Sequence, residues 1–203
     1  MLIPNFAFEF DALKSGHTLI CGIDEAGRGP WAGPVVASAV ILDQQNFPHG
    51  LNDSKKLNEA RREALFDPIM LSSQVGIGIV SAKEIDDINI LQATFLGMQR
   101  AFDQLNIKPD LALIDGNKSP KLNCKTQTII GGDAKSLSIA AASIIAKVTR
   151  DRIMHQLDLT YPHYGFARHK GYGTAAHATA LAKNGPCDEH RKSFKPIALL
   201  LSR

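Results

Sequence analysis

Alternating and periodic hydrophobic positions along the chain predict an α/β protein. The predicted strands are 18–23, 35–42, 75–80, 111–114 and 126–130. The predicted helices are 58–66, which stops or kinks before Pro68, then 85–105, 138–157 and 174–183. The segment 161–173 is expected to be a loop. Since strands and helices alternate without a repeat or a linker, we expect one domain over 1–203, with a central mixed sheet flanked by helices and a helical C-terminal part from about residue 174.

Acidic residues follow three of these strands, and a glycine accompanies each of them. Asp24 and Glu25 follow the first strand, Asp115 the fourth and Asp133 the fifth. Binding sites in α/β sheets form at strand ends, where the four carboxylates can converge. Carboxylates so close repel one another unless they take up protons or bind a hard cation such as Mg²⁺ or Mn²⁺. Two such ions can hold a phosphodiester and activate water for in-line attack. The alternative is a set of ordinary turns, because aspartate beside glycine is common turn chemistry.

Three glycine-rich or basic segments are candidate contacts to a phosphate or a sugar. They contain Gly27, Arg28 and Gly29, then Ser54, Lys55 and Lys56, and finally Tyr172. Glycines let a ligand approach the backbone, arginine offers a planar fork, and an aromatic ring in a basic loop suits stacking on nucleic acid. A tight turn, a solvated charge pair and a loop with a tucked tyrosine are the open alternatives.

Composition narrows the class of protein further. With 44% hydrophobic and 21% charged residues, the 203-residue chain is typical of a globular protein, and no stretch approaches the roughly 18 apolar residues of a membrane helix. The first eleven residues carry two acids and no basic residue, so we expect no secretory signal. The three cysteines are odd in number and far apart in sequence, which favours a reducing cytoplasmic setting over disulfides or a cysteine zinc site.

Charge and histidine are unevenly distributed along the chain. Residues 1–115 hold 9 Lys and Arg against 15 Asp and Glu, whereas residues 116–203 hold 14 against 5, and the whole chain has a net charge of +3. This asymmetry suits a protein that collects acids at one place and faces a polyanion elsewhere, unless folding mixes the halves. Four histidines occur in the C-terminal part without the spacing of a helical zinc site, so we expect loop or surface positions for them. They are His163, His169, His177 and His190.

Longer segments of the chain resemble the ribonuclease HII family. The matching segments are 22–30 (GIDEAGRGP), 53–57 (DSKKL), 114–117 (IDGN), 132–136 (GDAKS), 138–151 (SIAAASIIAKVTRD), 164–167 with 169–174, and 190–194 (HRKSF). They occur in order between about residues 18 and 196. Trp31 departs from the pattern, because a smaller apolar residue is expected there.

The resemblance implies a ribonuclease H-like fold and hydrolysis of the RNA strand of RNA–DNA hybrids. It also implies incision on the 5′ side of single ribonucleotides embedded in duplex DNA, leaving 3′-hydroxyl and 5′-phosphate ends, as ribonucleotide removal in DNA repair requires. The implied cofactors are two Mn²⁺ or Mg²⁺ ions bound with the substrate, and the implied state is a monomer without a membrane partner. A metal mechanism needs no attack by the ribose 2′-hydroxyl, which is then free to be recognised as the group that distinguishes RNA from DNA.

Site residues carry over by position in the matching segments. Four acids match the family's metal ligands: Asp24, Glu25, Asp115 and Asp133. Gly27, Arg28 and Gly29 match the segment that reads the 2′-hydroxyl at the RNA–DNA junction, and Tyr172 matches the tyrosine that packs on the adjoining deoxyribose. We expect Ser54, Lys55 and Lys56 to contact phosphate.

Three other readings are weaker. Type III ribonuclease H usually carries an extra N-terminal domain, for which the roughly 17 residues before the first strand leave no room. An exonuclease of the same superfamily would gather acids on a sheet but has no need of a glycine–arginine–glycine reader. A non-catalytic nucleic-acid-binding module leaves the acids unexplained, since without a metal they would repel phosphate.

Overall fold

A five-stranded mixed sheet forms the centre of the protein in a computed structural model that describes residues 3–202. The strands are β1 (Ile20–Ala26), β2 (Val35–Leu42), β3 (Ser73–Val80), β4 (Leu111–Asp115) and β5 (Lys125–Ile129). Their order across the sheet is β3-β2-β1-β4-β5. The β1–β2 and β2–β3 pairs are antiparallel, whereas β1–β4 and β4–β5 are parallel. The predicted α/β class with a mixed sheet is therefore confirmed.

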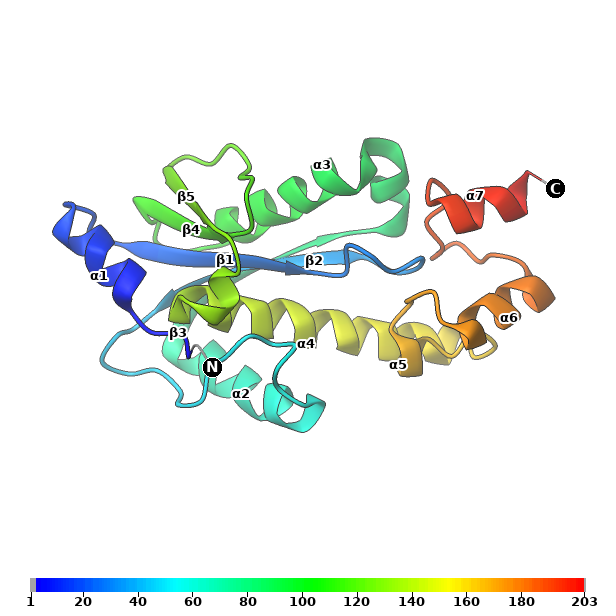
Figure 1. Cartoon of the computed structure of the whole chain (residues 1–203), viewed down its shortest axis with the longest axis horizontal. Coiled ribbons are helices and arrows are strands. Elements are labelled where there is room, and N and C mark those ends of the chain that lie inside the picture. The colour runs from blue at the N-terminus through cyan, green and yellow to red at the C-terminus, as the bar shows by residue number, and fades with distance from the viewer. Residues whose placement is uncertain (1–2, 203) are drawn as a thin grey trace.

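Helices cover both faces of this sheet, and further helices lie beyond one end of it (Figure 1). They are α1 (Ala7–Lys14), α2 (Glu59–Ser72), α3 (Ala82–Asp103), α4 (Leu137–Thr160), α5 (Phe166–His169), α6 (Ala175–Asn184) and α7 (Lys195–Leu201), with a 3-10 turn η1 (Gly132–Ala134). Helix α3 packs on one face, and α4 packs on the other with α2 beyond it. The three C-terminal helices gather at the far end of α4, away from β5. The predicted C-terminal helical part is confirmed.

The start of α4 lies unusually close to the central strand because a glycine faces it. An added Cβ at Gly22 would overlap the backbone of Ser138. Small side chains continue the close contact at Ala140, Ala141 and Ala142, which are fully buried. Helix α1 also supports this point, since Glu9 accepts hydrogen bonds from the Ser136 hydroxyl at 2.7 Å and from the Ser138 amide at 3.1 Å. The N-terminus of α4 is thus fixed against β1, the strand that carries the first acids.

Two predicted helices differ from those in the structure at one residue each, a proline and an asparagine. Helix α2 continues through Pro68 to Ser72 rather than stopping before the proline. Pro68 lies on the exposed face, where water can donate to the carbonyl of Ala64, which lacks the amide donor that residue 68 would otherwise supply. Helix α3 is broken at Asn89, whose φ is 67° and whose side chain accepts from the amides of Leu91 and Gln92. Asparagine adopts a positive φ more readily than most residues, and its side chain caps the new helix that begins there.

Other segments were predicted in part or not at all. The expected loop 161–173 contains the short helix α5, and the terminal helices α1 and α7 were not predicted. Strand β5 was expected to be apolar, but it lies at the sheet edge with only Ile129 buried. Among residues 3–202, no helix has the length and hydropathy needed to cross a bilayer.

Candidate active site

Three aspartates from separate elements meet where β1 and β4 end. Asp24 lies within β1, Asp115 ends β4 and Asp133 lies in η1. The parallel pairing of Ile23 with Ile114 brings the next residue of each strand, Asp24 and Asp115, side by side. Carboxylate oxygens of the three aspartates lie within 4.8 Å of one another. The structure thus brings together three of the four acids that the sequence singled out.

Backbone amides orient two of these carboxylates. The Glu25 amide donates to Asp24 Oδ1 at 2.7 Å, and the Gly132 amide donates to Asp115 Oδ1 at the same distance. An added Cβ at residue 132 would lie 2.6 Å from Ile139 Cδ1, so the Ile139 side chain would have to shift. The hydrogen bond from the Gly132 amide joins η1 to the end of β4. The spacing of the glycines after β5 indicates a turn, and the turn delivers the third carboxylate.

Burial and mutual repulsion perturb the acids strongly. The pKa of Asp24 is raised well above its usual value, first by burial and then by the charges of Glu25 and Asp115. The pKa of Asp133 is also raised, by burial and by the charges of Asp115 and Asp53, while Lys55 opposes the shift. Clustered carboxylate oxygens are the donor set that hard divalent cations prefer, and such a cation removes this repulsion. The residues present therefore fit a Mg²⁺ or Mn²⁺ site.

The fourth acid, Glu25, lies beside the three aspartates but points toward a cation. Its Oε1 is 3.3 Å from a guanidinium nitrogen of Arg28. Burial raises the pKa of Glu25, and the Arg28 charge and hydrogen bond act in the opposite direction. Glu25 also borders two surface hollows, one on the Tyr172 side and one beside α3. Its carboxylate is placed next to the aspartate cluster and outside the group whose oxygens lie within 4.8 Å.

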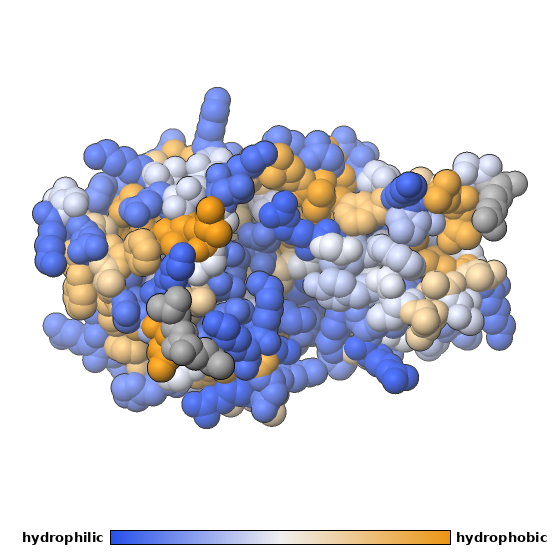
Figure 2. Space-filling model, viewed as in Figure 1, coloured by the Kyte–Doolittle hydropathy of each residue, from blue (hydrophilic) through white to orange (hydrophobic). Residues whose placement is uncertain are grey.

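The hollow on the Tyr172 side joins the acids to most of the predicted substrate contacts. Its lining consists of Asp24, Glu25, Ala26, Gly27, Arg28, Gly29, Ser54, Lys55, Lys147, Arg150 and Tyr172. An added Cβ at Gly29 would be 3.7 Å from the Tyr172 ring, so the loop and the ring are neighbours. Tyr172 is 48% exposed, which leaves ring surface free to contact a ligand. Figure 2 shows that hydrophilic side chains dominate the face it views and that hydrophobic surface there is broken into separate spots.

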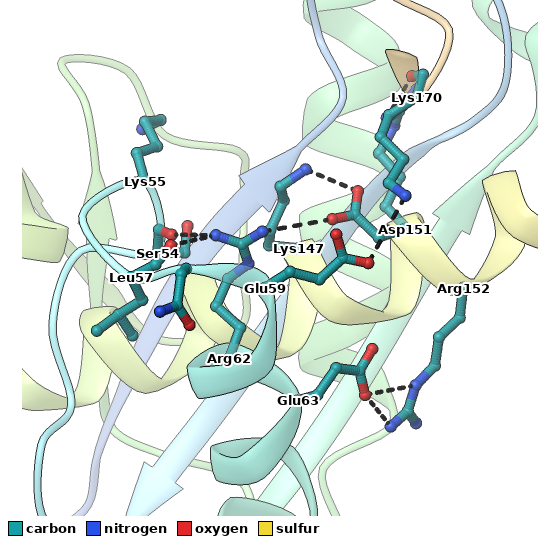
Figure 3. A network of polar contacts seen from close by, with 12 residues as sticks. Ser54, Lys55, Leu57, Glu59, Arg62, Glu63, Lys147, Asp151, Arg152 and Lys170 are labelled. Atoms are coloured by element: carbon teal, nitrogen blue, oxygen red, sulfur yellow. Dashed lines mark hydrogen bonds and ion pairs between the residues drawn. The ribbon is translucent and has the colours of Figure 1, made fainter. Parts of the chain in front are cut away.

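The lysine loop after β2 is anchored to α2 and α4. Arg62 donates to the Ser54 carbonyl at 2.9 Å, and its guanidinium lies 3.8 Å from Asp151. Asp151 also pairs with Lys147 at 2.6 Å, as Figure 3 shows. Lys55 Nζ lies 3.4 Å from Asp133, so this loop brings a cation to the edge of the acid cluster. Lys56 is exposed and does not line the hollow, whereas Ser54 and Lys55 do.

Comparison with known proteins decides the family. A family model described as Ribonuclease HII matches residues 21–197. The chain belongs to the ribonuclease HII family. Ribonuclease HII of Parvibaculum lavamentivorans is 54% identical over 202 residues, covering 99% of this chain and 75% of that protein. Ribonuclease HII of Magnetococcus marinus is 55% identical, covering 98% of this chain and 95% of that protein. The chain is accordingly an endonuclease that cleaves the RNA of RNA–DNA hybrids.

Solved structures agree with this assignment. Ribonuclease H2 of Pyrococcus horikoshii superimposes with a TM-score of 0.76 at 28% identity, covering 92% of this chain and 98% of that one. The ribonuclease HII from Archaeoglobus fulgidus, solved in complex with PCNA, gives a TM-score of 0.72 at 27% identity over 88% of this chain and 96% of that one. The predicted ribonuclease H-like fold and the suspected ribonuclease HII family are both confirmed.

Three basic residues beside this ribonuclease HII site received no role from the sequence. Lys147 and Arg150 of α4 line the hollow with Asp24. Arg191, which is fully buried, donates to the carbonyls of Gly27 and Arg28. They lie in the segments 138–151 and 190–194 that carried the resemblance. The available signal was a pair of cations three residues apart in a helix of mainly small apolar residues, and a pattern of that kind does not say whether they face inward.

The expectation of loop or surface histidines was wrong for His177, which lies in α6 and is buried, whereas His190 lies between α6 and α7 as expected but is buried too. His177 and His190 are fully buried, with 3.0 Å between their Nε2 atoms. Burial lowers the pKa of each to about 4, so both rings are neutral near neutral pH. His177 Nδ1 also contacts the Tyr172 carbonyl at 3.0 Å, and His169 stacks on His177. A neutral imidazole both donates and accepts, which lets these rings fill a polar interior beneath the Tyr172 loop.

Proposed function

We propose that this ribonuclease HII incises duplex DNA on the 5′ side of single embedded ribonucleotides, as well as cleaving continuous RNA in hybrids. The products would be 3′-hydroxyl and 5′-phosphate ends. The observation that carries the proposal is one hollow that contains the Asp24 carboxylate, the Gly27–Gly29 backbone and the Tyr172 ring. A site that only gripped phosphate would have no need of an exposed aromatic ring beside its acids.

The acids supply the hydrolytic part of the site. Asp24, Asp115 and Asp133 would hold Mg²⁺ or Mn²⁺, with Glu25 as an adjoining ligand once the cations offset its link to Arg28. Two such cations, when bound, supply Lewis-acid activation of water and charge stabilisation at the phosphate. Lys55, 3.4 Å from Asp133, brings a positive charge to the same edge, where a phosphate oxygen can accept from it.

Recognition of the ribonucleotide rests on the glycine loop and the ring. Gly27 has φ +97°, and an added Cβ there would overlap the Arg150 side chain, so residue 27 keeps its backbone close to the hollow only as glycine. The 2′-hydroxyl both donates and accepts, and it is the group by which a protein distinguishes RNA from DNA. Tyr172, 3.7 Å from the Cβ position of Gly29, is close enough to contact the next sugar. A ring against deoxyribose leaves no room for a further hydroxyl.

The reaction belongs in the cytoplasm, as part of the removal of ribonucleotides from DNA. The three cysteines are free, which suits a reducing compartment. The partners would be ribonucleotide-containing duplexes and hybrids, with the protein acting as a single domain and a monomer. A non-catalytic binding module is disfavoured, because three carboxylates within 4.8 Å would repel a phosphate chain without cations.

The test compares two substrates: a DNA duplex with one ribonucleotide and a continuous RNA–DNA hybrid. We expect cleavage of both only with added Mg²⁺ or Mn²⁺, and a single cut 5′ of the lone ribonucleotide. Tyr172→Ala should cost about ten- to a hundred-fold on the lone ribonucleotide, from the roughly 1–3 kcal/mol of an aromatic contact, and less on the hybrid. Tyr172→Phe is the matched control that keeps the ring. Failure to cut the lone ribonucleotide, or an equal proportional loss on both substrates, would contradict the proposal.

A further inference from the structure

Two arginines are completely buried against the loop that lines the active-site hollow. Arg150 of α4 is 1% exposed and Arg191, which precedes α7, is 0% exposed. Within residues 3–202, both guanidinium groups hydrogen-bond to backbone carbonyls and neither forms an ion pair with a carboxylate. Arginine is rarely buried without a partner of opposite charge, because removing it from water is costly. Their placement therefore calls for a reason beyond filling the core.

The carbonyls they bind belong to the two segments that face the substrate. Arg191 donates to Gly27 at 2.5 Å, to Arg28 at 2.9 Å and to Gly33, all within the loop between β1 and β2. Arg150 donates to Ala32 at 3.1 Å and Pro34 at 2.9 Å in the same loop. Arg150 also donates to the Lys170 carbonyl at 2.9 Å, two residues before Tyr172. One guanidinium thus fixes the glycine loop, and the other joins it to the tyrosine loop.

Close packing between these two segments makes the connection stiff. The Trp31 amide donates to the Gly171 carbonyl at 2.8 Å. An added Cβ at Gly173 would overlap the Trp31 ring, and one at Gly171 would overlap the Ala32 carbonyl. Trp31, the residue that departs from the family pattern, therefore belongs to the contact between the two loops, where its ring packs against Gly173. The planar, five-donor geometry of arginine suits several fixed carbonyls at once, which lysine cannot match.

We propose that Arg150 and Arg191 are positioning residues for substrate selection, which hold the Gly27–Gly29 backbone and the Tyr172 ring at one fixed separation. The inference rests on the proposed function, in which those two groups contact adjacent nucleotides. A ribose and the deoxyribose that follows it are then recognised together as a junction. On a continuous RNA strand the deoxyribose is missing, so the fixed separation contributes less there. The arginines act through the two loops and need no contact with the substrate.

The experiment measures the ratio of kcat/KM on the lone ribonucleotide to kcat/KM on the hybrid. We expect Arg150→Lys, which keeps the charge but not the fork, to lower this ratio about tenfold while the melting temperature shows that the variant is folded. The matched control is Arg152→Lys, two residues further along α4, where Arg152 pairs with exposed Glu63 (Figure 3). Arg152→Lys should leave the ratio unchanged. A parent enzyme that ignores the lone ribonucleotide would overturn the proposed function itself, before any arginine variant is made.

A double-mutant cycle separates positioning from general support. If Arg150 acts by placing the ring, then Arg150→Lys should change the ratio by less than about twofold when Tyr172 is already alanine. The proposal would be overturned if Arg150→Lys lowered kcat/KM equally on both substrates. It would also be overturned if the effects of the two single variants on the ratio multiplied in the double variant. Arg191→Lys, which loosens only the glycine loop, enters the same cycle if Arg150→Lys does not fold. If neither lysine variant folds, the arginines are structural supports and the proposal is wrong.

Discussion

Replacing one active-site aspartate by asparagine should stabilise the metal-free protein while abolishing its activity. Asp24→Asn keeps the shape of the side chain and an oxygen that can accept from the Glu25 amide. The substitution removes the negative charge of a carboxylate that has an oxygen within 4.8 Å of carboxylate oxygens of Asp115 and Asp133. At that distance two full charges repel by about 3.5 kcal/mol at an effective dielectric constant of about 20, and by about 0.9 kcal/mol in a water-like medium. We therefore expect a gain of about 1–3 kcal/mol in the free energy of unfolding.

The gain should depend on pH with a definite sign. The pKa of Asp24 is raised in the folded protein, so the folded state binds the proton more tightly than the unfolded state. Stability contributed by this group therefore falls as pH rises from about 3.9, the unfolded value, through the raised folded pKa. The advantage of Asp24→Asn should be small at about pH 5 and larger at about pH 8.

Urea unfolding in a chelating buffer measures the effect, with Asp67→Asn as a control at an exposed acid of α2. Added Mg²⁺ should make the parent more stable than Asp24→Asn. A cation that binds only the folded state stabilises the parent, and it binds the variant more weakly because one ligand is missing. Cleavage should fall by orders of magnitude while the duplex still binds. A variant less stable than its parent at high pH without metal would refute the view that repulsion strains this site.

Two other predictions concern the fold that supports the site. Burial holds the pKa of His177 and His190 near 4, below the usual 6.5, so the unfolded state binds more protons and stability should fall as pH drops from about 6.5 toward 4. The loss in the free energy of unfolding should be about 2 kcal/mol per imidazole at about pH 5. In urea titrations, His177→Gln should make the free energy of unfolding depend less on pH. An unchanged pH dependence would show that the rings are not buried in their neutral form. Gly22→Ala should destabilise the protein by about 3 kcal/mol, because the added Cβ would overlap the backbone of Ser138. Gly16→Ala is the control: no atom lies within 4 Å of its added Cβ, so it should cost only the strain of its positive φ. Equal changes in melting temperature for the two variants would contradict the packing argument.

The sequence predicted those parts of the site that depend on local pattern. Buried strands show as apolar runs, and acids beside glycines mark their ends, so the elements that carry Asp24 and Asp115 were predicted to within a few residues. The meeting of Asp133 with them depends on η1 approaching β4, which requires the parallel β4–β5 pairing. No local pattern specifies that pairing, and β5 itself is an exposed edge strand. The strand-end pattern included Asp133 among the candidate ligands, with an ordinary turn as the open alternative, and the resemblance to a family then assigned it as a ligand.

Two of the errors concern buried polar side chains, whose burial depends on tertiary contacts that a local pattern does not show. His177 and His190 were expected in loops or at the surface, but the two rings contact each other, and His177 also contacts a carbonyl 5 residues away. Arg191 gave no signal either, since its acceptors lie 158 to 164 residues away in the chain. Pro68 was expected to stop or kink the helix, but α2 continues through this exposed position to Ser72.

The acidic first half and the basic second half of the chain meet in the active-site hollow. Acids of the first half, including Asp24 and Glu25, line the same hollow as Lys147 and Arg150 from the basic second half. Folding therefore mixes the halves at the site itself rather than leaving an acidic end and a basic end. The hollow is lined by carboxylates that repel one another and by a buried guanidinium that has no carboxylate partner among residues 3–202. Divalent cations would neutralise the acids, and the exposed Arg28 and Lys55 of the same hollow can face a phosphate chain, whereas the Arg150 guanidinium is already bonded to backbone carbonyls. The site is thus electrostatically incomplete on its own, and the combination that completes it is the substrate with its metal ions.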